Sequence, residues 1–98
     1  MTVIIETLKV TEVQKLVSKG YDLLLNEYPF FSLEKHISQN FIIKINIFPY
    51  KNKSCLMTWL TENKRVYRDI NELGNILNLY RDCMYDIITS FRTIRRID

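Results

Sequence analysis

The stretch Ile70–Asp98, INELGNILNLYRDCMYDIITSFRTIRRID, is the segment around which the rest of the chain is organised. Its apolar residues recur at alternating steps of four and three, the spacing of one face of a helix. The residues with this spacing are Leu73, Leu77, Tyr80, Met84, Ile87, Phe91 and Ile94, and the stripe is widened by Ile76, Cys83 and Ile88. The pattern predicts one long helix whose apolar side packs on a sheet or on two further helices. Arg92, Arg95 and Arg96 are expected in its last turn, where the helix dipole favours positive charge.

The segment before residue 41 predicts a short strand followed by one helix. Thr2–Leu8 is rich in β-branched residues, which favour strands, although a helical lead-in is the alternative. Thr11-Glu12-Val13-Gln14 has the spacing of a capping box and predicts a helix that runs to about Asn26. Within this helix, Gly20 either allows a neighbouring element to approach closely or is merely tolerated. Pro29 ends the helix, because the residue before a proline avoids the helical conformation.

Aromatic residues surround this proline. Tyr28, Phe30 and Phe31 are expected in a loop that either folds onto the core or forms an exposed anchor for a partner. Ser32 is expected to cap a short helical turn that ends near Ile37.

Three strands are predicted between residues 41 and 70. Phe41–Phe48 and Cys55–Thr61 alternate in character, and a polar turn joins them. Glu62-Asn63 is expected to reverse the chain into the third strand, Lys64–Ile70. We therefore expect an α+β fold of order (β)-α-β-β-β-α, with an antiparallel sheet of three to four strands packed against the N-terminal helix and the long C-terminal helix. Residues 1–98 are expected to form a single small α+β domain.

In two of the predicted strands, alternate residues point to opposite faces of the sheet. In the first strand, Phe41, Ile43, Ile45 and Ile47 oppose Ile42, Lys44, Asn46 and Phe48. In the second strand, Leu56, Thr58 and Leu60 oppose Met57 and Trp59. This alternation suggests a sheet with one face against the core and one face toward solvent.

Composition argues against several classes of site. Gly20 and Gly74 are too few for a glycine-rich phosphate loop, and a lone histidine, His36, does not complete a catalytic relay. Cys55 and Cys83 fit no metal-binding spacing and are expected to be buried free thiols of a cytoplasmic protein. No signal peptide is recognised and no apolar run approaches ~20 residues, so no membrane association is expected. We expect no catalytic site, no metal and no cofactor.

A surplus of large apolar side chains predicts a protein-binding surface, because they exceed what one small core needs. The surplus residues are Leu23, Leu25, Phe30, Phe31, Ile42, Phe48, Leu79 and Tyr85. Asp82 and Asp86 lie four residues apart on the polar side of the long helix and repel each other, so a basic group of the sheet or of a partner is expected beside them. The predicted partner-binding residues are Phe30, Phe31, Leu79, Tyr85, Asp82 and Asp86. We expect a non-catalytic protein that occupies a partner's surface, as small inhibitors, immunity proteins and antitoxins do, with a symmetric homodimer as a further possibility.

The alternative prediction is a nucleic-acid-binding module that uses the basic hairpin region 44–68. Residues 41–70 hold six basic and two acidic residues, and the chain as a whole has a net charge of +3. Basic groups neutralise phosphates and aromatic rings stack on unpaired bases. The residues predicted for this role are Lys51, Lys53, Lys64, Arg65, Tyr67 and Arg68.

The predicted order of helix, three strands and helix resembles that of double-stranded RNA-binding domains. Those domains begin their second helix with lysines that clamp phosphates. The matching positions here, residues 71–75, read Asn-Glu-Leu-Gly-Asn, so no binding residue is carried over.

Overall fold

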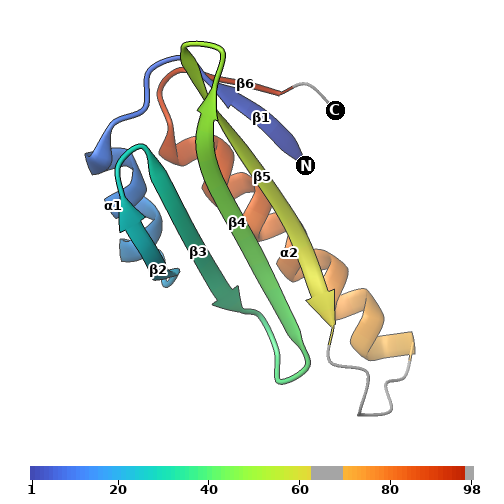
Figure 1. Cartoon of the computed structure of the whole chain (residues 1–98). Coiled ribbons are helices and arrows are strands. Elements are labelled where there is room, and N and C mark those ends of the chain that lie inside the picture. The colour runs from blue at the N-terminus through green and yellow to red at the C-terminus, as the bar shows by residue number, and fades with distance from the viewer. Residues whose placement is uncertain (63–69, 97–98) are drawn as a thin grey trace.

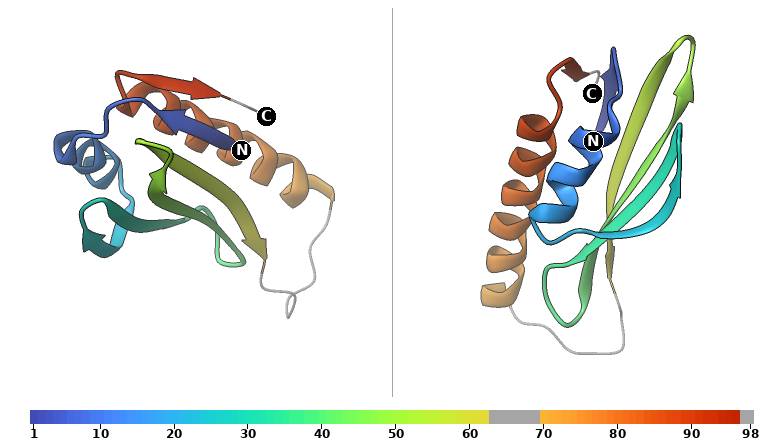
Figure 2. Two further views of the ribbon diagram at one scale, coloured as in Figure 1. Left: turned by 45° about the horizontal axis from the view of Figure 1, so that its top comes forward. Right: turned by 90° about the vertical axis from the view of Figure 1, so that its left-hand side faces the viewer.

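The computed structural model describes residues 1–62 and 70–96, with the backbone alone over residues 70–73. A six-stranded antiparallel sheet forms one layer, and two helices, α1 (Val10–Ser18) and α2 (Ile70–Ser90), lie together on one face of it (Figures 1 and 2). The strands follow the order β2-β3-β4-β5-β1-β6 across the sheet. Their bounds are β1 (Thr2–Ile5), β2 (Asp22–Glu27), β3 (Phe30–His36), β4 (Phe41–Tyr50), β5 (Lys53–Glu62) and β6 (Ile94–Arg96). The predicted α+β class is confirmed.

The β4–β5 hairpin is the centre of the sheet. Its strands pair without interruption from Phe41 opposite Glu62 to Tyr50 opposite Lys53. The connecting turn is shorter than the predicted polar turn, and it contains two residues, Lys51 and Asn52, with φ of 47° and 62°. Positive φ at both central residues gives a turn whose twist matches that of the flanking strands.

The hydrophobic core lies between the helices and the inner face of the sheet. Alternate residues of β4, such as Ile45 and Ile47, are fully buried, as are their cross-strand neighbours Leu33 and Leu56. The buried apolar side chains that the helices contribute are Val13, Leu16, Ile76, Cys83 and Ile87. Burial of one large aliphatic side chain contributes about 1.5–3 kcal/mol, so this layer holds the helices on the sheet.

The buried line of α2 is rotated relative to the predicted stripe. Residues of that stripe that are buried or partly buried are Tyr80, Met84, Ile87 and Phe91, together with Ile94, which lies in β6. Leu77 is more than half exposed, whereas Ile76 and Cys83 lie at the centre of the buried line. The rotation follows from α1, which packs against one side of α2, whereas no described element packs against the other side.

The prediction that the last helix runs to Asp98 was wrong. α2 ends at Ser90, and the chain turns back to form β6, which pairs with β1. The turn is held by the Glu6 backbone N–H, which donates to the Thr93 carbonyl at 2.7 Å. β6 satisfies hydrogen-bonding groups along the edge of β1 that would otherwise be open, a gain that a longer helix does not offer. Arg95 and Arg96 therefore lie in an edge strand and not at a helix end.

The prediction of a helix from Thr11 to Asn26 was also wrong. α1 ends at Ser18, and Gly20 follows with φ of 98°. The Gly20 N–H donates to the Val17 carbonyl at 3.0 Å and the Tyr21 N–H donates to the Leu16 carbonyl at 3.2 Å. This pair of bonds is the Schellman motif, which ends a helix at a glycine in the left-handed conformation.

The residues after α1 form strands where a helix end, a loop and a helical turn were predicted. β2 and β3 pair antiparallel across a turn at Tyr28 and Pro29, so Phe30, Phe31 and Ser32 lie in a strand. The sheet thus has six strands and not three or four, and the order of elements no longer resembles that of double-stranded RNA-binding domains. The predicted strand Lys64–Ile70 lies outside the described residues, apart from Ile70, which begins α2.

Candidate interaction surface

The face of the sheet opposite the helices carries no packed element within the described residues (Figures 1 and 2). Because side chains alternate along a strand, this face carries the residues between the buried ones. The register places Lys44 opposite Trp59 and Asn46 opposite Met57 on it. Phe30 lies one step beyond the pair Phe31–Ile47 and is therefore level with Phe48. We call this surface the open face.

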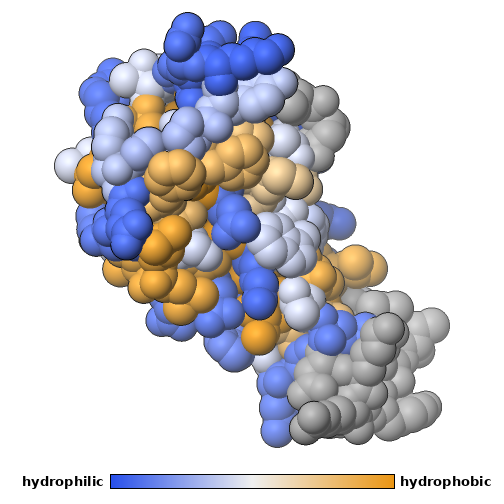
Figure 3. All heavy atoms as spheres, viewed as in Figure 1, coloured by the Kyte–Doolittle hydropathy of each residue, from blue (hydrophilic) through white to orange (hydrophobic). Residues whose placement is uncertain are grey.

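An apolar band crosses the open face over β3, β4 and β5. It consists of Phe30, Phe48, Met57 and Trp59, of which Phe30, Met57 and Trp59 are 48%, 44% and 40% exposed and Phe48 is partly exposed. Apolar side chains gather over these strands in the space-filling view (Figure 3). Isolated apolar residues are common on protein surfaces, whereas a contiguous group of large ones marks an interaction site.

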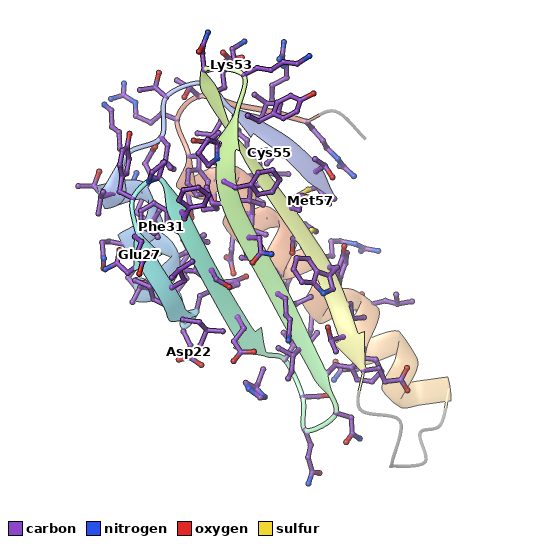
Figure 4. The ribbon with its side chains drawn as sticks, in the orientation of Figure 1. Asp22, Glu27, Phe31, Lys53, Cys55 and Met57 are labelled. Carbon is purple, nitrogen blue, oxygen red and sulfur yellow. The ribbon has the colours of Figure 1, made fainter. Side chains whose placement is uncertain are left out.

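Charged side chains of opposite sign flank the apolar band. The acidic ones, on β2 and β3, are Asp22, Glu27 and Glu34. The basic ones, on β5 and β6, are Lys53 and Arg95, whereas Lys44 of β4 lies between Glu34 of β3 and Trp59 of β5. Figure 4 shows Asp22 and Glu27 on one side of the sheet and Lys53 at the start of β5, beside the β4–β5 turn. The open face is therefore polarised, with an acidic side and a basic side.

At the basic side, Glu6 is shared by two cations. Its carboxylate lies 3.0 Å from the Lys53 ammonium group and 3.8 Å from the Arg95 guanidinium group. A shallow hollow of about 200 Å³ lies beside this cluster, lined by Ile4, Tyr50, Lys51, Lys53 and Arg95. The Lys51 ammonium group lies 5.3 Å from the centroid of the Tyr50 ring. Cations therefore border an exposed aromatic ring at this end of the sheet.

The predicted partner-binding residues lie on two opposite sides of the molecule. Phe30 is in the apolar band, whereas Phe31, its neighbour in β3, points into the core and is buried. The four residues on α2, behind the sheet in Figure 1, are Leu79, Asp82, Tyr85 and Asp86. Leu79 and Asp86 are partly buried, while Asp82 and Tyr85 are exposed. One partner surface that touches both Phe30 and Tyr85 would have to reach around the sheet.

Asp86 belongs to a polar contact between the two helices. Its carboxylate accepts the hydroxyl of Tyr21 at 3.3 Å, and the Lys19 ammonium group donates to its backbone carbonyl at 3.3 Å and to the Ser90 hydroxyl at 2.9 Å. A lysine at the end of a helix compensates the negative end of the helix dipole. Lys19 thus contacts the backbone of Asp86 and not its carboxylate. A lysine of the sheet, Lys35 of β3, also lies at this contact, with its ammonium group 5.1 Å from the centroid of the Tyr21 ring.

Two titratable groups in this contact are held in their protonated forms. Burial, followed by the nearby Cys83 and Asp86, raises the pKa of Tyr21 well above its ordinary value. Burial also raises the pKa of the Cys83 thiol, which the Tyr21 hydrogen bond and the charge of Lys35 offset only in part. A protonated, buried thiol is a poor nucleophile, so this cluster joins the helices and does not resemble a reactive site.

Two of the six residues predicted for nucleic-acid binding lie together, at the β4–β5 turn. They are Lys51 and Lys53, beside the hollow described above. The other four, Lys64, Arg65, Tyr67 and Arg68, fall outside the described residues.

The sequence prediction did not include Met57 and Trp59 among the partner-binding residues, and it counted Phe48 as surplus without assigning it to the site. The alternation had already separated them from the buried residues of their strands. What was missing was the location of both helices on the other face, which leaves these side chains uncovered.

The described residues include no group of three or more His, Cys, Asp or Glu side chains that could hold a metal ion. Neither helix of the described chain combines the length and the apolar character that a membrane crossing requires. Comparison with known proteins finds no match to this chain among family models, curated proteins or solved structures.

Proposed function

We propose that this chain is a non-catalytic protein-binding protein that uses its open face to occupy a surface of a partner protein. The observation that carries the proposal is the apolar band of Phe30, Phe48, Met57 and Trp59 on a sheet face with no covering element among the described residues. Aromatic residues and methionine are enriched at the centres of protein interfaces. Binding there would act by occlusion, as it does in small inhibitors, immunity proteins and antitoxins.

The charges that flank the band favour a protein partner over a polyanion. Asp22, Glu27 and Glu34 on β2 and β3 would repel a phosphate backbone laid across the face. A protein surface can match both signs, with basic groups opposite this acidic side and acidic groups opposite the basic side. The partner would therefore present an apolar patch between a basic rim and an acidic rim.

Nucleic acid is the second candidate partner, favoured by one observation. Lys51 lies over the exposed Tyr50 ring, and Lys44 is the cross-strand neighbour of Trp59. Cations beside exposed rings suit single-stranded nucleic acid, whose bases stack while its phosphates are neutralised. Acidic Glu34 is the other cross-strand neighbour of Lys44, which makes nucleic acid the weaker candidate.

Site-specific photo-cross-linking tests the proposal. A photoreactive phenylalanine derivative at Met57 in the open face should capture a discrete protein in the cells that produce the chain. The matched control places the same group at the exposed Asn78 on α2, away from the open face. This variant should not capture that protein. The captured protein is then purified, and its affinity is measured against the wild type, Met57→Lys and Asn78→Lys.

Met57→Lys should weaken this complex about tenfold or more, whereas Asn78→Lys should leave it unchanged. Trp59 is the only tryptophan, so its fluorescence reports directly on burial of the band. Complex formation should shift its emission to shorter wavelength and protect it from a soluble quencher. A partner that binds Met57→Lys and the wild type equally would contradict the proposal. Quenching of Trp59 by single-stranded RNA or DNA that weakens steeply with salt would support the second candidate instead.

A further inference from the structure

The shallow hollow of about 200 Å³ at the β4–β5 turn is lined by three basic side chains and, among the described residues, by no acidic one. Lys51 and Lys53 come from the turn and the start of β5, and Arg95 comes from β6. Buried Ile4 and the half-exposed ring of Tyr50 complete the lining. Figure 4 shows Lys53 beside this turn. We call this space the basic hollow.

The sheet brings the three cations together from distant parts of the chain. Lys53 is opposite Tyr50 in the β4–β5 ladder, and Arg95 is opposite Ile4 in the pairing of β6 with β1. The Glu6 carboxylate lies 3.0 Å from the Lys53 ammonium group and 3.8 Å from the Arg95 guanidinium group, but it is not part of the described lining. Three positive charges and one negative charge leave a surplus of two positive charges at the basic hollow.

We propose that the basic hollow binds a small phosphate monoester whose organic part carries a planar ring, as a nucleoside monophosphate does. A phosphate monoester has a charge of about −1.5 to −2 near pH 7, which matches the surplus of positive charge, whereas a carboxylate supplies only one negative charge. The Arg95 guanidinium group can donate two parallel hydrogen bonds to phosphate oxygens, and Lys51 and Lys53 contribute compact positive charges. The Tyr50 ring offers a surface on which a planar ring can stack.

The size and the surroundings of the basic hollow favour a small ligand over a nucleic-acid strand. Its volume of about 200 Å³ is below the usual range of ligand pockets, about 300–1,000 Å³, so it accommodates a phosphate and part of the group attached to it. A strand that continued from the basic hollow across the open face would meet the acidic pair Asp22 and Glu34, which would repel its phosphates. The expected ligand is therefore a small molecule with a single phosphate group.

Isothermal titration calorimetry at low ionic strength tests which ligand binds. AMP is the probe, because it joins one phosphate to a planar base, and its dissociation constant should be below about 1 mM. Ribose 5-phosphate, which lacks the base, should bind at least about fivefold more weakly. Adenosine, which lacks the phosphate, should show no binding at the same concentrations.

Charge-neutral variants identify the site. Lys51→Gln and Arg95→Gln should each weaken AMP binding about tenfold, since each removes a positive charge from the phosphate. Lys15→Gln, at an exposed position of α1, is the matched control because it changes the net charge equally, and it should leave the affinity unchanged. Tyr50→Leu should lower the affinity for AMP to that for ribose 5-phosphate and leave the affinity for ribose 5-phosphate unchanged. Circular dichroism verifies that each variant is folded.

Several results would overturn the proposal. One is the absence of binding at about 10 mM AMP, and another is equal affinity for AMP and for either ribose 5-phosphate or adenosine. Equal affinity of the wild type, Lys51→Gln and Arg95→Gln for AMP would place the ligand elsewhere. Tighter binding of a single-stranded oligonucleotide without a terminal phosphate than of AMP would assign the basic hollow to nucleic acid. These titrations contain no partner protein, so their outcome is independent of the function proposed for the open face.

Discussion

The side-chain carboxylate of Glu12 accepts the backbone N–H of Arg92 at 2.7 Å, across 80 positions of the chain. Its other oxygen accepts the backbone N–H of Lys9 at 3.1 Å, at the start of α1. Glu12 is only 2% exposed, so these two N–H groups replace the hydration that the carboxylate loses on folding. One side chain therefore joins the start of α1 to the segment that leaves α2 and leads into β6.

Glu12→Gln should destabilise the protein substantially. The amide nitrogen of glutamine donates and does not accept, so one of the two backbone N–H groups would face another donor and lose its partner. We expect the free energy of unfolding to fall by about 2 kcal/mol, measured by urea denaturation. Glu6→Gln is the control, because Glu6 makes its ion pairs at the surface and should contribute less than about 1 kcal/mol. Equal losses in the two variants would contradict this role for Glu12.

The two glycines should respond to alanine with opposite signs. Gly20 has φ of 98°, where an L-residue is strained by about 1–2 kcal/mol, although a Cβ there would meet only the Lys35 side chain at an ordinary distance of 3.7 Å. Gly74 lies in α2 with no atom within 4 Å of a Cβ, so alanine should stabilise the helix by up to about 1 kcal/mol. Urea denaturation of Gly20→Ala and Gly74→Ala measures both effects. A neutral Gly20→Ala would show that the helix end does not depend on this glycine.

Gly20 also shows why part of the fold was not predictable from a periodic pattern. The apolar residues on both sides of it continue a helical spacing, so the pattern alone predicted a helix to about Asn26. The glycine was interpreted as a tolerated residue or a point of close approach, whereas it ends α1. Two leucines in β2, Leu24 and Leu25, are then exposed at the edge of the sheet. Tertiary pairing with β3 outweighed the local helical preference.

The apolar patterns correctly predicted strands and a helix where one face of the element is buried and the other is exposed. The alternation in β4 and β5 separated core residues such as Leu56 from Met57 and Trp59. The apolar period of α2 identified the helix but not its end, because β6 is specified by the free edge of β1, a property of the assembled sheet. The open face was likewise not predictable, since it is exposed only because both helices pack on the other face of the sheet.

Alkaline pH should destabilise the folded state through Tyr21. Burial raises the pKa of Tyr21 above its ordinary value of 10.0, so the folded state holds this proton more tightly than the unfolded state. The resulting stability is present in full below about pH 10 and is lost as pH rises above that value, by up to about 1.4 kcal/mol per pH unit. Cys83, whose pKa is raised by burial from 9.0, should add to this loss at somewhat lower pH.

Urea denaturation as a function of pH measures this loss. Tyr21→Phe should have a shallower decline above pH 10, since the buried phenol is gone. Tyr28→Phe, at a highly exposed tyrosine, is the matched control and should follow the wild type. Parallel declines in all three proteins would show that Tyr21 does not carry the alkaline sensitivity.

Neighbouring residues of β5 should separate stability from binding. Leu56 is fully buried beneath the helices, so Leu56→Ala should lower the free energy of unfolding by about 2–5 kcal/mol through lost burial and the cavity that remains. Trp59 lies on the open face and is partly exposed, so Trp59→Ala should cost clearly less stability. For affinity toward the partner, Trp59→Ala should cause the larger loss. Trp59→Ala removes part of the contact surface, whereas a folded Leu56→Ala variant retains it. Urea denaturation compares the stability losses of the two variants. Their affinities for the captured partner are measured under conditions in which both variants are folded. A Trp59→Ala variant that loses as much stability as Leu56→Ala and keeps its affinity would assign Trp59 to the fold and remove it from the interface.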